Sequence, residues 1–357
     1  MKPLLLTLFS CLAAVSAVGQ TNDSVTLLRH SRCYAGAPIR KFSDMTDLVR
    51  LKDATFMPAS PAVYDGKPYS ATSKGQVLVT SSMSIDGGFE VKGSIEATPA
   101  VSATMVVVGS TAKFVTAHDR VTGNVRWYHK TKSAVRTSPI IAGGFVYASC
   151  EDGTVVALDT LGKLKWSAKL KGKPGSPAFD DGLVFVGTSE GKCVALDAIT
   201  GKQVWTSDAG GRTPAVANAM VYVINRNGAV IALDEKTGAE KWRYDADAEP
   251  KCFEIAVSNE YLAYAEGVSL IVLNAKTGKK EWAIGFDRPV CGAPMIVGDV
   301  VYLPISNWKL NGYDLNTSIK LCSADIGFAP WGSPSYGGGK IFYPNKETLY
   351  TFSGEEQ

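Results

Sequence analysis

The residues of this chain that could carry chemistry are few and far apart. Its three histidines are His30, His118 and His129, and neither a Cys-x-x-Cys pair nor a mixed cysteine and histidine cluster accompanies them. The His-Glu-x-x-His pattern and the glycine loops that hold phosphate are also absent from the sequence. We therefore expect no metal site and no catalytic residues of these kinds, and we interpret His118 as structural.

The elements that hold these residues follow from an internal repeat. The pattern Ala-Leu-Asp, two residues, Thr-Gly, three residues, Trp recurs at a period of roughly 37 to 40 residues, which marks an array of similar units. Cys322 takes the Trp position in a degenerate copy. The other copies carry the acid or amide and the indole as Asp119 and Trp127, Asp159 and Trp166, Asp197 and Trp205, Asp234 and Trp242, and Asn274 and Trp282.

Each unit opens with a proline, or with Ile255 in one case, ahead of a valine-rich run. Pairs of apolar runs hinged on dipeptides such as Asp152-Gly153 predict strand, tight turn, strand. The Asp-x-x-Thr-Gly stretch predicts a second turn, because Asp accepts backbone N–H groups and Gly tolerates positive φ. Every unit is therefore expected to be a sheet of about four antiparallel strands, the blade of a β-propeller.

The two ends of the chain predict how the ring closes. The unit that begins at Pro334 ends before its outer strand, whereas residues 46–51 match the outer strand of the other units. If this N-terminal strand completes the C-terminal blade, neither terminal sheet edge stays open. The expected fold is all-β, an eight-bladed β-propeller of four-stranded antiparallel blades. Its tryptophans are interpreted as core residues that wedge between neighbouring sheets.

These repeats resemble the PQQ-like β-propellers, the family that includes quinoprotein dehydrogenases and the propeller lipoprotein of the outer-membrane barrel assembly machinery. The resemblance covers residues 44–354. A dehydrogenase of this family is expected to carry adjacent cysteines over its cofactor and a calcium site of Glu, Asn and Asp, and no adjacent cysteines occur here. We therefore expect a non-catalytic scaffold without PQQ or calcium. The alternative is a PQQ-dependent oxidoreductase.

Candidate binding residues lie where equivalent positions of the repeat differ. The positions three residues before each unit's proline should converge on one mouth of the channel, since they are related by the ring symmetry. Together with their neighbours they combine charge with aromatic side chains, a composition favoured at binding hot spots. A second interpretation is that long polar side chains fill a wide, wet channel. The candidates are Glu96, Arg136, Arg212, Lys251, Phe253, Arg288 and Trp331.

Two cysteines occupy matching positions in adjacent units. Cys252 and Cys291 each lie three residues before their unit's proline or its Ile255 equivalent, so they form a candidate disulfide, with two free thiols as the alternative. Cys193 and Cys322 are expected to be buried apolar residues.

The N-terminus predicts export. Lys2 precedes an apolar stretch from Leu4 to Val15 and then small residues, so residues 1–19 are predicted to be a signal peptide. We expect no lipid anchor at Cys11. Residues 20–43 should form a leader or strap and residues 44–357 one propeller domain, placed in the periplasm or outside the cell. A net charge of +3 argues against nucleic acid, so the expected partner of this monomer is an envelope or secreted protein.

Overall fold

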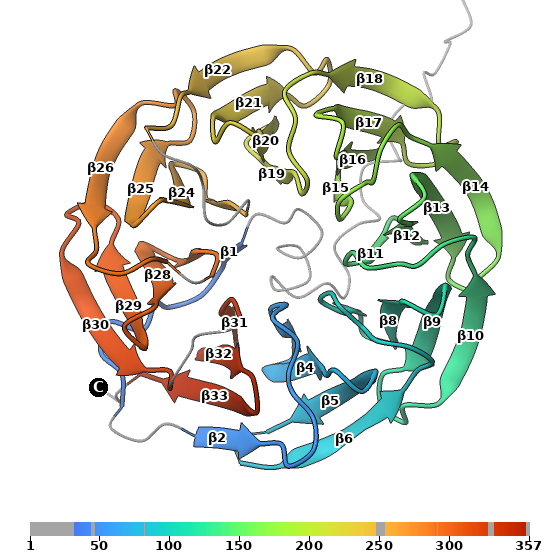
Figure 1. Ribbon diagram of the computed structural model, residues 1–357, viewed down its shortest axis with the longest axis horizontal. Coiled ribbons are helices and arrows are strands. Elements are labelled where there is room, and N and C mark those ends of the chain that lie inside the picture. The colour runs from blue at the N-terminus through green and yellow to red at the C-terminus, as the bar shows by residue number, and fades with distance from the viewer. Residues whose placement is uncertain are drawn as a thin grey trace, which may run out of the picture.

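The computed structural model describes residues 32–43, 47–81, 83–247, 254–290, 292–327 and 332–354. Within these ranges the chain contains strands, turns and bends but no helix. Its strands form eight sheets arranged as a ring (Figure 1). The predicted eight-bladed β-propeller is therefore confirmed. None of these residues belongs to a helix long and apolar enough to cross a membrane.

The first four blades each contain four consecutive strands, which follow one another from the axis outwards. Blades one and two are β3 (Ala62–Tyr64), β4 (Lys67–Ala71), β5 (Gln76–Thr80) and β6 (Ile85–Glu90), then β7 (Ala100–Val101), β8 (Met105–Ser110), β9 (Phe114–Asp119) and β10 (Val125–Lys130). Blades three and four are β11 (Ile140–Ala142), β12 (Phe145–Ser149), β13 (Thr154–Asp159) and β14 (Leu164–Lys169), then β15 (Ala178–Asp180), β16 (Leu183–Gly187), β17 (Cys193–Asp197) and β18 (Gln203–Ser207).

The remaining four blades follow the same order, with additions from the N-terminus. Blades five and six are β19 (Ala215–Ala217), β20 (Met220–Ile224), β21 (Val230–Asp234) and β22 (Glu240–Tyr244), then β23 (Ala256–Val257), β24 (Tyr261–Glu266), β25 (Ser269–Asn274) and β26 (Lys280–Gly285). Blade seven is β27 (Met295–Val297), β28 (Val300–Ile305), β29 (Lys309–Asp314) and β30 (Lys320–Asp325), extended at its inner edge by β1 (Cys33–Tyr34), and blade eight is β31 (Ser335–Gly337), β32 (Lys340–Asn345), β33 (Thr348–Ser353) and β2 (Asp47–Arg50).

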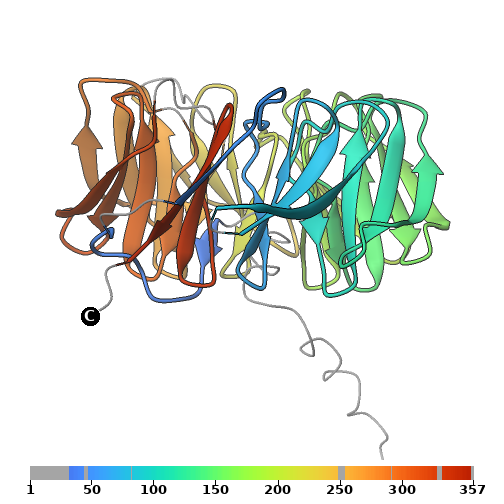
Figure 2. The same ribbon diagram turned by 90° about the horizontal axis from the view of Figure 1, so that it is seen from below.

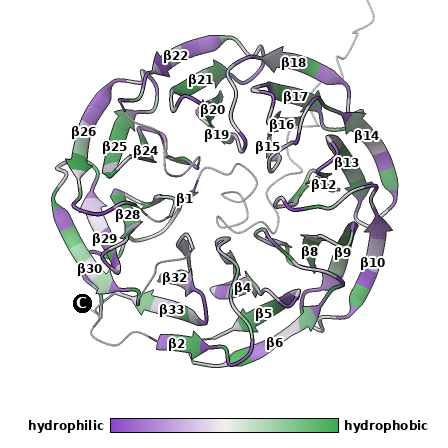
Figure 3. Ribbon diagram, in the orientation of Figure 1, coloured by the Kyte–Doolittle hydropathy of each residue, from purple (hydrophilic) through white to green (hydrophobic). Residues whose placement is uncertain are grey.

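Burial follows the position of a strand in its blade. Every residue of β8 is buried, because a middle strand is covered by a neighbouring sheet on each side. The outer strand β14 buries only Trp166 and exposes most of its other side chains. Figure 3 shows this gradient, with apolar middle strands such as β25 and hydrophilic outer strands such as β22. The core therefore consists of the layers between the blades.

The Asp-x-x-Thr-Gly segments form the turns between the third and the outer strands. In blade four the Asp197 carboxylate accepts the backbone N–H groups of Ile199, at 3.2 Å, and Thr200, at 2.7 Å. Gly201 then adopts a φ of +69°, where a side chain would be strained. These hydrogen bonds lower the pKa of the Asp197 carboxyl, led by that from the Thr200 hydroxyl. The repeat thus encodes a turn that its own side chains close.

The tryptophans join each blade to the next one. The indole N–H of Trp205 donates to the Glu235 carbonyl of the following blade at 2.9 Å. Its ring lies so close to Gly238 that a Cβ added to this glycine would be 2.6 Å from the ring. Trp166 and Trp242 make the same contacts with the blades that follow them. The Trp and the Gly of the repeat are therefore partners across the blade boundary.

The ring closes as the sequence predicts, through β2. This strand pairs antiparallel with β33, with Asp47 opposite Thr351 and Arg50 opposite Thr348. In Figure 1 the blue β2 lies beside the red β33, so the two ends of the chain share one sheet. Blade eight is thereby a composite of N-terminal and C-terminal segments.

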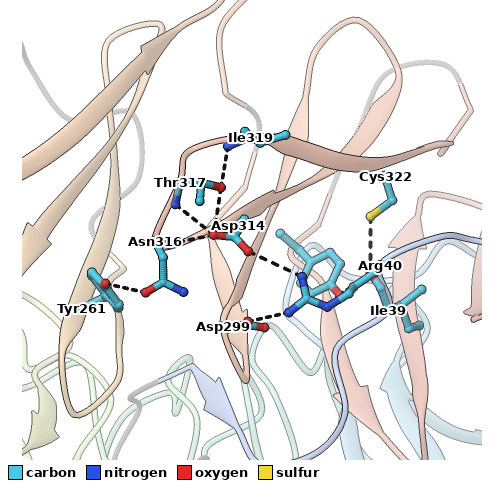
Figure 4. Close-up of polar contacts among 10 residues, drawn as sticks. Ile39, Arg40, Tyr261, Asp299, Asp314, Asn316, Thr317, Ile319 and Cys322 are labelled. Atoms are coloured by element: carbon cyan, nitrogen blue, oxygen red, sulfur yellow. Dashed lines mark hydrogen bonds and ion pairs between the residues drawn. The ribbon is translucent and has the colours of Figure 1, made fainter.

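Residues 32–43, which we call the N-terminal strap, run along blade seven before the chain reaches β2. The strand β1 in this strap pairs in parallel with β27. Ile39 places its carbonyl where the hydroxyl of Tyr302 donates to it at 2.7 Å and the thiol of Cys322 at 3.4 Å. Arg40 then reaches Asp299, at 2.5 Å, and Asp314, at 3.5 Å (Figure 4). Cys322 occupies the Trp position of the repeat, and the small thiol leaves room for the strap.

The two faces of the ring carry different connections. Because all four strands of a blade are antiparallel, the connections alternate between the faces, and Figure 2 shows the strands running between them. One face, called the turn face, carries the turns between the first and second strands and the Asp-x-x-Thr-Gly turns. The opposite face, called the cavity face, carries the segments that lead into each inner strand.

Candidate axial binding cavity

A cavity of about 600 Å³ lies on the axis of the ring, where the segments before the inner strands meet. Blades one to six and blade eight contribute to its wall, and the N-terminal strap adds Arg32 and Tyr34. The wall is rich in hydroxyl groups, which link neighbouring blades. The Ser138 hydroxyl accepts the backbone N–H of Thr98 at 3.2 Å, and the Ser176 hydroxyl accepts that of Ser138 at 3.0 Å. Equivalent Ser and Thr residues of successive blades thus form a chain of hydrogen bonds around the axis.

The cavity gathers part of the predicted channel mouth. Glu96, Arg136 and Arg212 line it, whereas Arg288 is exposed in the loop before β27 and does not belong to the lining. Five further candidates lie outside the described residues, namely Lys251, Cys252, Phe253, Cys291 and Trp331. The aromatic component of the predicted mouth and the candidate disulfide therefore stay predictions.

The charges on one side of the cavity form a chain of ion pairs across three blades. Arg136 contacts Glu96 of the preceding blade, and its Nε lies 3.3 Å from Glu151. Lys173 of the next blade lies 3.5 Å from the same Glu151. The hydrogen bond to Glu96, followed by that to Glu151, raises the pKa of the Arg136 guanidinium above its ordinary value. Glu96 and Glu151 are therefore neutralised by neighbouring blades.

Arg32 of the strap spans the other side of the axis. Its guanidinium donates to the carbonyl oxygens of Pro294, at 2.7 Å, and Pro334, at 2.8 Å, and to the Ser60 hydroxyl at 2.9 Å. It also lies 3.2 Å from the Glu254 carboxylate. These four partners belong to four different blades, and only 9% of Arg32 is exposed. The repeat pattern does not reveal this residue, because it lies outside the repeats.

Arg212 differs from the other charged residues of the wall. Lys173 and Arg136 each have an acidic partner within 4 Å, and so does Arg32. Arg212 lines the cavity but forms none of the ion pairs found among the described residues. Arg212 is an exposed residue of this wall, so its guanidinium can offer a planar pair of N–H donors to a carboxylate from outside.

The family assignment follows from a match to a family model. The model described as outer membrane protein assembly factor BamB matches residues 69–177 and 151–256, together more than half of the chain. This chain belongs to the PQQ-like repeat propeller family. The matched residues include four copies of the Asp and Trp repeat, from Asp119 and Trp127 to Asp234 and Trp242.

The relatives of this PQQ-like propeller have names from two functional classes. It is 34% identical to outer membrane protein assembly factor BamB of Nitrosomonas eutropha over 89 residues, which cover 25% of this chain and 22% of the relative. It is 35% identical to a 1-butanol dehydrogenase (cytochrome c) of Thauera butanivorans over 94 residues, 22% of this chain and 14% of the relative. The chain thus spans less than a quarter of the length of these two relatives.

The ring itself matches solved structures over most of its length. The crystal structure of BamB from Moraxella catarrhalis aligns with a TM-score of 0.73 at 18% identity, covering 87% of this chain and 99% of that one. At this identity the likeness shows the fold alone.

The donor set of the described cavity wall does not fit a calcium site. Calcium is held by several oxygen ligands, mostly carboxylates and amide carbonyls. The described wall contains no Asp or Asn, and its three carboxylates, Glu96, Glu151 and Glu254, each contact an arginine. Across the described ranges no three His, Cys, Asp or Glu side chains gather in a way that could hold a metal ion.

One pentapeptide of the wall matches a hydrolase pattern by spacing alone. Gly187 to Gly191 read Gly-x-Ser-x-Gly, with Ser189 in the cavity wall. That pattern acts at a turn from a strand into a helix, whereas here it joins the antiparallel strands β16 and β17. The Ser189 hydroxyl accepts the backbone N–H of Lys173 at 2.8 Å, and no histidine belongs to the described wall. This serine therefore links the turn between β16 and β17 to the segment before β15.

Proposed function

We propose that this chain is an exported, non-catalytic scaffold that binds a protein partner of the cell envelope through its cavity face. The observation that carries the proposal is that the described acids of the cavity wall form ion pairs with arginines. Two acids are bound to Arg136 and a third to Arg32, so the groups that an enzyme would use as base or ligand serve to join blades. Arg212 is left to meet an acidic group of a partner.

The names of the relatives support the same proposal. The family model and the BamB relative carry the name of an outer membrane protein assembly factor. We carry this over as a role in docking envelope proteins, in the periplasm or outside the cell, after removal of residues 1–19. The mature chain would act as a monomer, because the ring closes on itself and needs no second copy to satisfy its sheet edges.

The test is capture of partners by immobilised protein. The unchanged chain and the variants Arg136→Ala and Arg212→Ala would be incubated with an envelope extract, and bound proteins identified by mass spectrometry. Arg226→Ala is the matched control, since this exposed arginine lies on the same face, in the turn between β20 and β21, but outside the cavity wall. We expect Arg212→Ala to reduce capture at least about tenfold, the loss of roughly one charge-assisted hydrogen bond. Equal capture by all variants would refute binding at the cavity face.

The alternative function is a PQQ-dependent oxidoreductase, favoured by the dehydrogenase among the relatives. Purified protein would be incubated with PQQ and calcium and assayed for dye-linked oxidation of alcohols and sugars. We expect no turnover above that of PQQ and calcium alone. Turnover that requires the protein would replace the scaffold proposal by an enzymatic one.

A further inference from the structure

A row of exposed apolar side chains follows the rim of the turn face on four consecutive blades. The second residue after the Asp of the repeat is Val121, Leu161 and Ile199 in blades two to four, and these side chains are 80%, 69% and 73% exposed. Met83 takes the matching place in blade one and is 74% exposed. The equivalent residues of blades five to seven are Lys236, Lys276 and Asn316.

A second set of apolar residues extends each tip onto its outer strand. Ile85, Val125 and Leu164 are the first residues of the outer strands of blades one to three, Val204 is the second residue of β18 in blade four, and the four are 48% to 60% exposed. We call these eight residues the apolar rim. They account for eight of the thirteen large apolar side chains exposed in the described part of the chain, so this exposure is concentrated rather than scattered.

The turns hold the tips of the apolar rim outward. In blade two the Asp119 carboxylate accepts the N–H groups of Val121 and Thr122, at 3.1 and 3.0 Å, and in blade three Asp159 accepts that of Leu161 at 3.0 Å. The backbone under each tip is therefore fixed. Because equivalent turns lie on one face of the ring (Figure 2), the tips lie near one plane and can meet a flat surface together.

Exposed lysines lie next to the apolar rim, at its edge. Lys163 and Lys202 precede the outer strands of blades three and four and are exposed, and Lys236 and Lys276 continue the line of tips. The acids of these turns point into the turns or meet cations, as Asp119 does with Arg126 at 3.1 Å and Asp159 with Lys165 at 3.3 Å. Asp180 and Asp181 also lie on this face, in a turn closer to the axis, and Asp181 lies 3.5 Å from Lys236.

We propose that the apolar rim docks this protein onto the surface of a lipid bilayer that contains anionic lipids. Aliphatic tips in one plane can enter the boundary between headgroups and acyl chains, and lysines beside them attract anionic headgroups. Binding to a curved protein groove would instead require tips at different heights. Docking through the turn face would direct the cavity face away from the membrane, so the bilayer and a protein partner could be bound at the same time.

The test is binding to vesicles by co-sedimentation, with purified protein and defined lipids. Vesicles of equal parts phosphatidylglycerol and phosphatidylcholine are compared with vesicles of phosphatidylcholine alone. The triple variant Val121→Ser, Leu161→Ser and Ile199→Ser removes three apolar tips without changing charge or any buried residue. We expect this variant to bind the anionic vesicles at least about tenfold more weakly, since each tip would lose part of its apolar transfer free energy. Asn227→Ser, an exposed polar residue on the cavity face, is the control and should bind unchanged.

The charged part of the proposal has a separate readout. Lys236→Ser with Lys276→Ser should weaken binding to anionic vesicles several-fold at low salt and have little effect at high salt, because salt screens exposed charges. Absence of vesicle binding by the unchanged protein, or equal binding by the triple tip variant, would overturn the proposal. If the tip variant lost a protein partner while vesicle binding was absent, the rim would be a protein interface instead. If Arg212→Ala left partner capture unchanged, the proposed function would fail, but the vesicle-binding result would still stand.

Discussion

The contact between Trp205 and Gly238 provides the sharpest test of how the blades are joined. Trp205 is 7% exposed, its ring centroid lies 5.8 Å from that of Phe185, and its indole N–H donates to a carbonyl of the next blade. Trp205→Ala removes a large buried side chain and should lower the free energy of unfolding by roughly 3 to 5 kcal/mol. Trp205→Phe keeps most of the buried area but loses the hydrogen bond, so we expect about 1 to 2 kcal/mol.

Gly238 provides the second arm of a double-mutant cycle. Gly238→Ala alone meets two penalties, a φ of +71° and a Cβ placed 2.6 Å from the Trp205 ring. With Trp205→Ala already present the ring is gone and only the backbone penalty of about 1 to 2 kcal/mol stays. The two substitutions should therefore couple, with the glycine substitution costing less in the alanine background.

The assay is urea unfolding followed by circular dichroism and by fluorescence, with Tyr128→Ala as the control. Tyr128 is an outer-strand aromatic that is 71% exposed, so its loss should change the free energy of unfolding by no more than about 0.5 kcal/mol. If Gly238→Ala cost the same with and without Trp205, the ring would not press on this glycine. A Trp205→Ala cost below about 1 kcal/mol would likewise refute the wedge between blades.

Three further predictions concern the closure of the ring and the cysteines. Deleting residues 46–52 should open the β33 edge and produce aggregates in size-exclusion chromatography, and a stable monomer would contradict the composite blade. Arg32→Ala should lower the free energy of unfolding by roughly 2 to 4 kcal/mol, because four blades lose a shared donor. Arg32→Lys should recover part of this stability. Equal stability of all three proteins would show that Arg32 does not hold the blades together. Peptide mapping without reduction decides between the two alternatives for Cys252 and Cys291: a cross-linked peptide would establish the candidate disulfide, and two alkylatable thiols would rule it out.

The repeat predicts the ring because its residues act within short range. Asp197 closes its own turn, and Trp205 contacts the turn of the next blade, so each unit specifies its neighbour without long-range information. The composite blade could be predicted from the repeat as well, although its strands lie far apart in the sequence, since residues 46–51 match the outer strand that the last unit lacks. The repeated Asp turn and the Trp that follows it thus predict the array of blades.

The cavity could not be derived from the sequence to the same degree. Symmetry predicts that Glu96, Arg136 and Arg212 face one opening, but not that Arg136 binds Glu96 and Glu151, because partner choice depends on side-chain reach across blades. Arg32 lies in a segment without repeat pattern. Cys322 is a sequence signal of the strap, because Ile39 of the strap contacts the position where the other units have a tryptophan.

The composite blade has a consequence for the order of events in folding. The strand β2 precedes the four-strand segments of blades one to seven in the sequence, whereas its partner β33 follows them. Until β2 and β33 pair, seven blades can stack one after another, but the ring stays an open spiral with two unpaired edges. The final pairing joins residues about 300 positions apart, so it is a slow step of high contact order. A chain that stops before β33 therefore leaves β2 without its partner strand and cannot close the ring.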